Sequence, residues 1–499
     1  MTTVKELFAG IDCTIIGNAS LEVKGLQYRS DQCSQGDVFF CIVGMTVDGH
    51  SFAQDAIDRG AKVLVVERKV YLADATDVTE VVVNDSRKAM AQAAANFYGH
   101  ASTDLALVGI TGTNGKTTTT YLVEHIARVA NKKTGVIGTV GIKVGDEIAA
   151  SARTTPESSD LQEIFARMRD AHVDVLAMEV SSHALDLERT WATQFAVTAF
   201  SNLTQDHLDY HKTFEAYFEA KALLFSDAYP AKRVICIDDE WGEELLRRCT
   251  EAGDEVISTG FNAAAQIHPL NIDYASTHTD LALSVDGERF SFSYPLVGRF
   301  NVSNVMLAFG IALALGIPAN TVVTALESAP QVPGRLQRID ISAARATASA
   351  ASELPTVFVD YAHTPDALEK AIASVKALTA GRTLVVFGCG GNRDASKRPI
   401  MGRAALSADY AVVTSDNPRR EDPLAIIDAI VAGMNEGVGS FEIEPDRRSA
   451  IAKAIAQAQA NDSILVAGKG HEDYQIIGEE KRHFSDAEVV AEELEKALS

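Results

Sequence analysis

One loop of the sequence carries the residue types of a phosphate-binding site. Residues 111–118 (TGTNGKTT) follow the apolar run DLALVGI and open the stretch TTTTYLVEHIARVA, where Leu122, Ile126 and Val129 have helical spacing. Glycines let backbone N–H groups curve around phosphate oxygens, the lysine can reach the β- and γ-phosphates, and a threonine hydroxyl can coordinate Mg²⁺. Ile110 replaces the first glycine of G-x-x-x-x-G-K-[ST], but the apolar run, GKT and the helical pattern remain. The loop therefore predicts nucleotide binding.

A carboxylate follows a later apolar run. Glu179 ends DVLAME and precedes VSSH. The carboxyl ends of parallel strands are where α/β sheets bind ligands, and Mg²⁺ prefers oxygen ligands, so Glu179 is a candidate metal ligand. The alternative is that this segment only begins a helix, for which Ser181 and Ser182 are suitable caps. From Glu179 alone the two interpretations carry similar weight.

Two histidines and a lysine come after the next apolar run, FAVTAF. His207 and His211 in NLTQDHLDYH are four residues apart and would share a face of a helix. A zinc-protease interpretation fails because Leu208 stands where that pattern needs a general-base glutamate. Isolated histidines are more often structural than metal-bound, but His207 follows a strand near the phosphate loop. Lys221, in FEAYFEAKALLF, taken alone is best interpreted as a solvated lysine on a helix.

Along the chain, short apolar runs alternate with longer amphipathic stretches, and the residues described above lie among them. This alternation indicates an α/β fold. The runs KVLVVE, DLALVGI, DVLAMEV, FAVTAF, RVICID, TVFVDY, RTLVVFG, ADYAVVT and SILVAG are expected to be buried strands. We expect three domains, 1–102, 103–332 and 333–499, with boundaries at NFYGHAST and at the turn-forming Val332-Pro333-Gly334. The Ala/Ser-rich segment 343–353 is expected to be an exposed loop without chemistry.

Composition narrows the class of protein. The chain has 499 residues, 46% of them hydrophobic, and a formal charge of −23 from 45 Lys+Arg and 68 Asp+Glu. The hydrophobic content excludes wholesale disorder, and the negative charge disfavours general binding to nucleic acid or anionic membrane. The six cysteines form no C-x-x-C pair, and there is no run of about 18 apolar residues. The residues MTTVKELFAGIDCT lack the charged-then-apolar pattern of a signal peptide, so none is expected. We expect a cytoplasmic multidomain protein.

Taken together, TGTNGKTTT, MEVSSHAL, NLTQDHLDYH and AKALLF resemble the ATP-binding domain of the Mur ligase family, the ATP-dependent amide-forming enzymes of peptidoglycan synthesis. The resemblance extends to DGHSFAQDAIDRGA near the N-terminus and to DYAHTPDAL, FGCGGNRDASKRPIMG, DNPRREDP and AGKGHEDYQ in the last third. It implies an α/β fold with a central P-loop ATPase-type parallel sheet, an N-terminal UDP-binding domain and a C-terminal Rossmann-like domain. Within the family, the resemblance is to members that add the third amino acid of the stem peptide.

The resemblance also implies roles for individual residues. The ATP-binding set is Gly112, Thr113, Asn114, Gly115, Lys116, Thr117, Thr118, Asn301, Arg335 and Asp360. The Mg²⁺ set is Thr117, Glu179, His207 and Lys221, the last as a carbamate, and Lys116, Lys221, Glu179 and His207 form the catalytic set. The UDP-muramoyl-dipeptide set is Ser30, Thr154, Thr155, Ser181 and Arg189. The amino-acid set is Arg393, Asp416, Asn417, Pro418, Arg419, Gly468 and Glu472.

The implied reaction adds an amino acid to UDP-MurNAc-L-Ala-D-Glu through an acyl phosphate, in a monomer that uses ATP and Mg²⁺. We expect meso-diaminopimelate as the amino acid, because the planar fork of Arg419 suits its distal carboxylate. Surface charges balanced by Glu421 and Asp422 are the plain alternative for Arg419 and Arg420. L-lysine or L-ornithine, a folylpolyglutamate synthetase-like ligase, and a P-loop ATPase or switch protein remain alternatives.

Four positions depart from the family pattern. Arg29 and Asp31 flank Ser30 in the reverse of the usual Asp-Ser-Arg order, Arg153 replaces a common Asn, and Leu187 replaces a frequent Gln. We expect these changes to alter details of how the nucleotide sugar is bound and not the reaction. FGCGGNR lacks the third glycine of a dinucleotide fingerprint, so NAD and FAD are rejected as cofactors.

Overall fold

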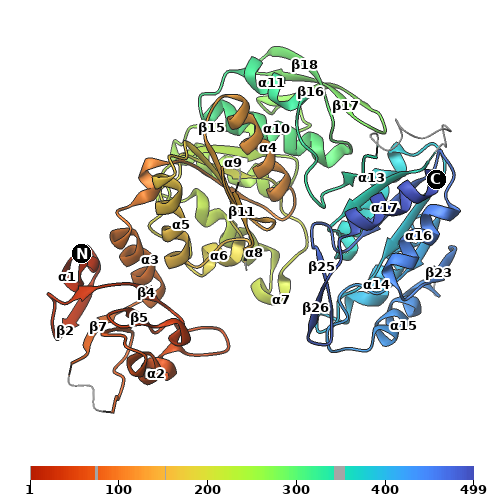
Figure 1. Cartoon of the computed structure of the whole chain (residues 1–499). Coiled ribbons are helices and arrows are strands. Elements are labelled where there is room, and N and C mark those ends of the chain that lie inside the picture. Colours follow the sequence, from red (N-terminus) through yellow and green to blue (C-terminus); the bar gives the residue numbers. More distant parts are fainter. Residues whose placement is uncertain are drawn as a thin grey trace. The chain divides into compact units, whose positions relative to one another are not determined.

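The computed structural model in Figure 1 describes residues 2–73, 77–145, 147–151, 153–341, 354–435 and 437–498. The expected loop at 343–353 lies outside these residues. The chain divides into two compact units, Met1–Ile267 with Met306–Val322, and His268–Val305 with Val323–Ser499. Each unit is built on parallel sheet, which confirms the α/β expectation.

The first unit begins with a small sheet of order β2-β7-β6-β5-β4, in which β4 to β7 are parallel and β2 is antiparallel to β7. Its elements are β1 (Thr2–Thr3), α1 (Val4–Leu7), β2 (Cys13–Ile16), β3 (Glu22–Val23), β4 (Leu26–Gln27), η1 (Ser30–Gln32), β5 (Val38–Phe40), η2 (Gly49–Phe52), α2 (Ala53–Asp58), β6 (Val63–Val66), β7 (Thr79–Val83) and α3 (Ser86–Phe97). The Asp85 side chain caps α3 by accepting from the N–H groups of Arg87 and Lys88.

The larger sheet of this unit has the order β11-β10-β9-β12-β8-β13-β14-β15, parallel from β9 to β15 and extended by antiparallel β10 and β11. The elements are η3 (Ala101–Asp104), β8 (Ala106–Thr111), α4 (Lys116–Val129), β9 (Thr134–Gly138), β10 (Gly141–Val144), β11 (Glu147–Ala149), α5 (Ser158–Asp170), β12 (Val175–Glu179), α6 (Ser182–Asp186), β13 (Val197–Phe200), α7 (Leu208–His211), α8 (Phe214–Ala222), η4 (Leu223–Phe225), β14 (Lys232–Cys236), α9 (Glu240–Ala252) and β15 (Val256–Thr259).

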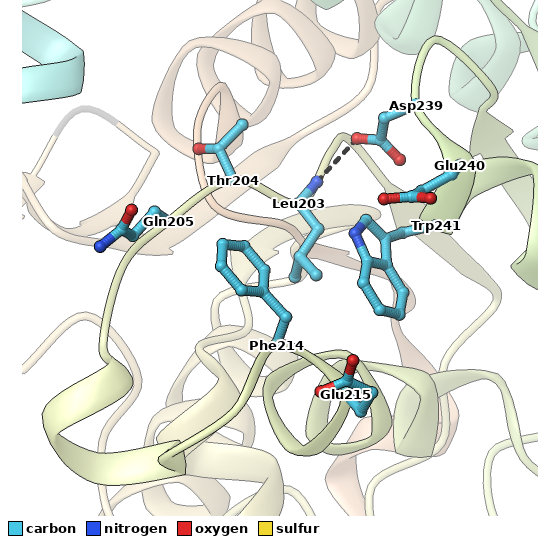
Figure 2. Close-up of a pocket in the computed structure, with 8 residues that line it drawn as sticks. All are labelled: Leu203, Thr204, Gln205, Phe214, Glu215, Asp239, Glu240 and Trp241. Carbon is cyan, nitrogen blue, oxygen red and sulfur yellow. Dashed lines mark hydrogen bonds between the residues drawn. The ribbon is translucent and has the colours of Figure 1, made fainter.

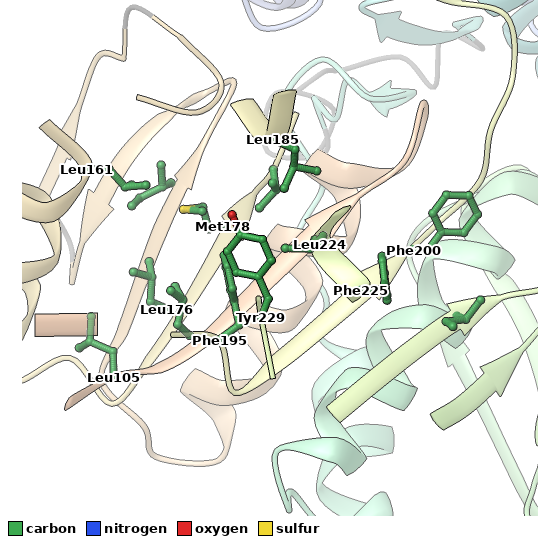
Figure 3. Close-up of a cluster of buried hydrophobic side chains, with 14 of the residues drawn as sticks. Leu105, Leu161, Leu176, Met178, Leu185, Phe195, Phe200, Leu224, Phe225 and Tyr229 are labelled. Carbon is green, nitrogen blue, oxygen red and sulfur yellow. The ribbon is translucent and has the colours of Figure 1, made fainter. Parts of the chain in front are cut away.

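The core of this sheet explains why its strands are continuous apolar runs. Leu176 and Met178 of β12 lie in one buried cluster with Leu161 of α5 and with Phe195 and Tyr229 (Figure 3). Helix α4 packs on β9 and β12. A parallel strand that is covered by helices on both faces has no polar side, so its sequence does not alternate.

The second unit contains an antiparallel hairpin, β17–β18, and a sheet of order β19-β20-β24-β21-β22-β23 that is parallel except for β19. Its elements are β16 (Ile267–Tyr274), β17 (Thr279–Val285), β18 (Glu288–Tyr294), β19 (Gln337–Arg338), β20 (Thr356–Asp360), α13 (Pro365–Leu378), β21 (Thr383–Phe387), α14 (Lys397–Ala405), β22 (Tyr410–Val413), α15 (Pro423–Met434), β23 (Phe441–Ile443), α16 (Arg447–Gln457), β24 (Ser463–Ala467), β25 (Tyr474–Ile477), β26 (Glu480–His483) and α17 (Asp486–Leu498). Helices α10 (Arg299–Ala314) and α11 (Ala319–Glu327) contribute residues to both units.

Side chains of the second unit's sheet alternate between two cores. Phe358 and Leu465 lie in a core with residues of α13, α14 and α15, whereas Val357 and Ile464 lie in another with residues of α16 and α17. The period of two follows from the pleat of the strands. The sheet is therefore covered on both faces, as in doubly wound folds.

Every apolar run that was expected to be a strand forms one, and the stretch after the phosphate loop forms helix α4. The antiparallel strands β10, β11 and β19 were not foreseen. The expected domain boundaries near residues 102 and 332 remain predictions. In the part of the chain that the structure describes, no helix combines the length and apolar character needed to cross a bilayer.

Candidate active site

The phosphate loop joins β8 to α4, as the sequence predicted. Gly112 and Gly115 have φ of +143° and +85°, a region that favours glycine, and Gly115 is the N-terminal cap of α4. A Cβ atom on Gly112 would lie 1.9 Å from Ser201 Oγ, so no larger residue fits there without displacement. The loop is fixed from β13's side, where Asn202 Oδ1 accepts from Asn114 N at 2.9 Å. The first turn of α4 is thereby held as an anion-binding helix start.

Two lysines converge inside this loop. Lys116 Nζ donates to Gly112 O and Thr113 O, both at 2.9 Å, and Lys221 Nζ donates to the same Gly112 O at 2.8 Å. Lys221 is buried on α8, and its ammonium lies 4.4 Å from the centre of the Tyr217 ring. Burial, reinforced by the neighbouring Lys116 charge, holds the pKa of Lys221 well below its usual range. The expectation of a solvated lysine, based on the helix alone, is therefore wrong.

Glu179 lies at the carboxyl end of β12, where its carboxylate is held from two sides. Oε2 accepts from Thr117 Oγ1 and Thr139 Oγ1, each at 3.1 Å, and Oε1 accepts from Thr139 N at 2.9 Å. A Cβ atom on Gly138 would come within 2.3 Å of Oε1, so the glycine makes room for the carboxylate. Ser181, not Glu179, caps α6 by accepting from Ala184 N. Thr139 was not foreseen, because its loop carries no chemical pattern.

The two histidines of NLTQDHLDYH have different environments. His207 precedes α7 as its N-terminal cap with φ of +51°, and its half-exposed ring has Nε2 3.4 Å from Asp206 Oδ2. His211 ends α7, is buried, and its Nε2 lies 2.9 Å from Ser182 Oγ. The two therefore do not form a helical metal-binding pair. His183 lies between them, and burial lowers its pKa to about 4.

Four residues of the proposed substrate set converge beside Glu179. Thr155 Oγ1 donates to Glu179 O at 2.9 Å and accepts from Ser181 N at 3.1 Å. Arg189 Nη1 donates to Thr155 O at 3.2 Å, and the hydroxyls of Thr154 and Thr139 lie 3.0 Å apart. Ser30, the fifth member, lies in η1, where Arg29 and Asp31 on either side form an ion pair of 2.7 Å. The reversed charges around Ser30 thus neutralise each other.

Glu157 is a buried carboxylate that the sequence analysis missed. Its Oε1 is 2.6 Å from Arg153 Nη1 and 3.0 Å from Arg189 Nη2, and its Oε2 is 3.8 Å from Arg87 Nη1. Arg153, which departs from the family pattern, therefore has a partner in this chain. Three guanidinium groups around one carboxylate leave local positive charge in a protein of charge −23.

In the second unit, the residues proposed to complete the ATP site have separate anchors. Asn301 is buried and donates from Nδ2 to Val297 O at 2.8 Å. The Arg335 guanidinium lies 5.0 Å from the centre of the Tyr361 ring. Asp360 accepts from the N–H groups of Leu336 and Ala362 at 2.6 and 2.9 Å, and burial raises its pKa.

A charged cluster in the second unit contains the amino-acid set of residues. Asn417 Nδ2 donates to Glu472 Oε2 at 2.9 Å, and a Cβ on Gly468 would lie 3.0 Å from Asp416 Oδ2. Arg419, with φ of +52°, donates from Nη1 to Gly391 O at 2.9 Å. Gly390 lies against Arg419 and Arg393, and Gly391 against Pro418. We refer to Arg393, Asp416, Asn417, Pro418, Arg419, Gly468 and Glu472 as the C-terminal charged cluster.

A pocket of about 530 Å³ lies next to the phosphate loop, with Phe214 and Trp241 among three carboxylates (Figure 2). It is lined by Leu203, Thr204, Gln205, Phe214, Glu215, Asp239, Glu240 and Trp241. Thr204 belongs to both sites, since its Oγ1 accepts from Asn114 Nδ2 at 3.1 Å. Asp239 Oδ2 accepts from Leu203 N at 2.9 Å and so fixes the shared wall. The negative lining disfavours phosphate, which leaves anion binding to the loop.

The donors around the loop suit Mg²⁺. The Thr117 hydroxyl and the Glu179 carboxylate are hard oxygen donors 3.1 Å apart. Among the residues that the structure describes, no group of three or more His, Cys, Asp or Glu side chains is arranged to hold a metal ion. Mg²⁺ is commonly bound by one or two protein oxygens together with substrate phosphates and water, so this donor set fits it.

Three segments of the chain match models of one protein family. Residues 22–98 match the family model described as "Mur ligase family, catalytic domain", residues 110–312 match "Mur ligase middle domain", and residues 344–470 match "Mur ligase, glutamate ligase domain". The middle match spans the phosphate loop, Glu179, His207 and Lys221.

Individual relatives agree over nearly the whole length. The chain is 43% identical to the UDP-N-acetylmuramoyl-L-alanyl-D-glutamate–2,6-diaminopimelate ligase of Geobacillus kaustophilus, with 94% of each chain covered, and 40% identical to that of Clostridium botulinum, with 97% of this chain and 98% of the relative covered. A solved structure of a protein with this name is 29% identical, covers both chains completely and has a TM-score of 0.71. The folylpolyglutamate synthase of Mycobacterium tuberculosis complexed with ADP shares the fold, at 20% identity, a TM-score of 0.60 and coverage of 76% of this chain and 91% of the other. The chain belongs to the Mur ligase family.

Proposed function

We propose that the protein is an ATP-dependent amide ligase that joins meso-diaminopimelate to the D-glutamate γ-carboxylate of UDP-N-acetylmuramoyl-L-alanyl-D-glutamate. The observation that carries the proposal is the arrangement at the phosphate loop. Lys116 and Lys221 both donate hydrogen bonds to Gly112 O, and the Thr117 hydroxyl donates a hydrogen bond to the Glu179 carboxylate. Relatives about 40% identical over nearly the full length carry the name of this activity. The proposed partners are ATP, meso-diaminopimelate and UDP-MurNAc-L-Ala-D-Glu, and neither nucleic acid nor a membrane is proposed as a partner. We also propose that the protein is a monomer located in the cytoplasm.

The proposed chemistry has two steps. A carboxylate is a poor electrophile, so the γ-phosphoryl group of ATP is first transferred to it, and ADP leaves. The uncharged amine then attacks the acyl phosphate, and the tetrahedral intermediate expels phosphate. In the first step, the N–H groups at the start of α4 bind phosphate oxygens and Lys116 offsets charge on the transferring group. Orientation and electrostatics would be the main contributions of the protein.

Mg²⁺, when bound, would supply positive charge beside the phosphates of ATP. Thr117 and Glu179 are the residues proposed to hold it, with His207 and a carbamylated Lys221 contributing. The support is the chemistry of the Thr117 and Glu179 oxygens and their separation of 3.1 Å. Thr139 would orient the carboxylate through its two hydrogen bonds.

Carbamylation of Lys221 is the least expected part of the proposal. Its amine would add to carbon dioxide, with loss of a proton, and so become an anion. A carbamate there would place a negative charge beside Lys116, where burial and the Lys116 charge disfavour an ammonium. The support from geometry is the burial of Lys221 and, among the residues that the structure describes, the absence of any carboxylate within ion-pair distance of its Nζ.

The proposed amino-acid site is the C-terminal charged cluster. Diaminopimelate has a distal carboxylate and a distal ammonium, whereas lysine has only the ammonium. Arg419 would bind the distal carboxylate and Asp416 and Asn417 the distal ammonium, with Arg393 and Glu472 completing the charge pattern. The hydrogen bond from Arg419 to Gly391 O supports this by fixing the guanidinium at the cluster.

The function is tested by measuring ADP release with UDP-MurNAc-L-Ala-D-Glu and meso-diaminopimelate, L-lysine, L-ornithine or no amine. We expect release to depend on the amine and to be most efficient with diaminopimelate. Equal efficiency with L-lysine would make this a lysine-adding ligase. Release that needs no amine would instead favour the ATPase or switch alternative. Replacing UDP-MurNAc-L-Ala-D-Glu with folate tests the folylpolyglutamate synthetase alternative. The sequence segments DNPR and DGHSF argue against that alternative.

The amino-acid assignment makes a sharper prediction. Arg419→Ala should lower the preference for diaminopimelate over lysine by roughly 10²-fold or more, because a site built around a substrate group discriminates strongly against the analogue that lacks it. Arg420→Ala is the matched control, since that side chain is 75% exposed and pairs with Glu479. The ratio of kcat/KM values for the two amines is the measurement. An unchanged ratio in Arg419→Ala would contradict the assignment.

A further inference from the structure

A buried lysine lies at the centre of the C-terminal charged cluster but was not assigned to it. Lys469 follows β24, and its side chain has no exposed surface. Its Nζ lies 3.6 Å from Asp416 Oδ1, 3.5 Å from Glu472 Oε2 and 3.4 Å from Asn417 Oδ1. An ammonium has three N–H groups, and here they face three members of the cluster.

The Asp416 carboxylate shows why a cation is needed at this point. The Asp416 side chain is 91% buried, and within the described part of the chain its Oδ1 has no hydrogen-bond donor. Gly468, at φ of +118°, lets Oδ2 approach the backbone, because a Cβ would be only 3.0 Å away. A buried charge is costly unless it is paired, and Lys469 forms an ion pair with this oxygen.

The second carboxylate depends on the same ammonium. Glu472 Oε2 accepts from Asn417 Nδ2 at 2.9 Å, and Asn417 Oδ1 accepts from Ile476 N at 2.9 Å. Lys469 thus contacts both residues of this hydrogen bond, Asn417 through Oδ1 and Glu472 through Oε2. Arg447 is a further cation near Asp416 and Glu472, but it makes two hydrogen bonds of 2.7 Å to Asp486.

We infer that Lys469 is a positioning residue for the amino-acid substrate. It holds Asp416 and Glu472 side by side and orients Asn417 between them. The two carboxylates alone carry a charge of −2, and Lys469 brings the charge of this trio, Asp416, Glu472 and Lys469, to −1. The cluster can then receive one ammonium of a zwitterionic amino acid without two uncompensated carboxylates. The inference rests on the proposed function, because it assigns the substrate of that reaction to this cluster.

A purely structural role is the competing explanation, and it predicts different kinetics. A lysine that only supports the fold would, when replaced, lower stability and activity without distinguishing among substrates. A positioning lysine would act on the amino acid alone. Its effect would also depend on Glu472, since residues in one network show non-additive changes.

The first measurement compares Lys469→Met with Lys481→Met. Lys481 is the matched control, since both lysines lie over the Tyr474 ring, at 5.5 and 3.9 Å, but Lys481 is on exposed β26. We expect Lys469→Met to raise KM for the amino acid by roughly 30-fold or more, in line with the loss of one partner of a buried charge pair. KM for ATP and for the UDP-linked acceptor should stay within about threefold, and Lys481→Met should resemble the unmodified protein.

The second measurement places Lys469→Met in a Glu472→Gln background, which restores the charge of the trio to −1 and protects folding. We expect the factor by which Lys469→Met raises KM for the amino acid to fall to a third or less of its value in the unmodified background. Equal factors in both backgrounds, or a lower melting temperature with no selective change in KM, would overturn the inference. If no amine stimulates ADP release by the unmodified protein, the proposed function itself fails, and the inference fails with it.

Discussion

At the scale of single residues, one carboxylate unites the phosphate loop and the substrate residues. The Glu179 side chain bonds to Thr117 and Thr139, while its main-chain carbonyl accepts from Thr155. Binding of a metal ion at the Glu179 side chain would therefore be linked, within one residue, to Thr155 of the proposed UDP-muramoyl-dipeptide set. This dual attachment explains why Glu179 is buried even though it is proposed to serve a metal ion.

The roles of Glu179 and His207 can be separated from packing by choosing different substitutions. Glu179→Gln keeps an oxygen for Thr139 but removes the charge, and His207→Ala removes a half-exposed ring. Each should lower kcat by roughly 10²-fold or more, as expected when one electrostatic group is removed from a preorganised site. Melting temperatures should change little. A large loss of melting temperature with near-normal turnover would show that the residue is structural.

The state of Lys221 is open to a chemical test. Lys221→Ala should remove most activity, because a carbamate at this position would be lost together with the lysine. A short-chain carboxylic acid should restore part of the activity by supplying an anion in the space that the side chain leaves. Formamide, which has a similar size but no charge, is the control. Full activity of the variant without any additive would contradict the proposed role.

At the scale of secondary-structure elements, the strands and helices could be predicted from the sequence, whereas several site residues could not, because their roles depend on tertiary contacts. The buried strands and helix α4 were predictable because apolar runs and helical spacing record burial directly. The phosphate loop was predictable because its chemistry lies in consecutive residues. Thr139, Glu157 and Lys469 were not found in this way, since no chemical pattern marks them and each is completed by a residue far away in the sequence, namely Glu179, Arg87 and Asp416 respectively.

A contact between two such segments gives a prediction about pH. Tyr28 Oη donates to Asp160 Oδ2 at 2.8 Å, linking the segment after β4 to α5. Burial raises the pKa of Asp160, so the folded state binds its proton more readily than the unfolded chain does. The carboxyl group therefore favours folding at low pH, and this contribution is lost as pH rises from the ordinary aspartate pKa through the raised value.

Asp160→Asn should remove this dependence while keeping an oxygen acceptor for Tyr28. The measurement is the melting temperature of the variant minus that of the unmodified protein, in the same buffer system at each pH. This difference should be more positive at pH 7 than at pH 4. Asp170→Asn, at the exposed end of α5, controls for the loss of one negative charge. Equal differences at both pH values would show that the Asp160 pKa is not raised by folding.

At the scale of the whole molecule, charge is distributed unevenly. The net charge is −23, and yet cations gather at the phosphate loop and around Glu157. Anionic groups are repelled by the average surface and attracted at such local concentrations of positive charge. Binding of an anion at these places would therefore depend on local lysines and arginines rather than on long-range steering by the net charge.

The same excess of negative charge should limit stability in a way that salt can reveal. Like charges on a folded protein repel one another, and the Debye length falls from about 30 Å at 0.01 M to about 10 Å at 0.1 M ionic strength. At pH 7.5, raising NaCl from about 0.02 to about 0.3 M should therefore increase the melting temperature by a few degrees, since screening relieves this repulsion more than it weakens exposed ion pairs. Near pH 5, close to the sequence pI of 4.9, the net charge is small and the increase should disappear. Choline chloride should act like NaCl, because screening does not depend on the identity of the cation. A fall in melting temperature with salt at pH 7.5 would mean that ion pairs such as those of Arg247 and Arg248 outweigh the repulsion.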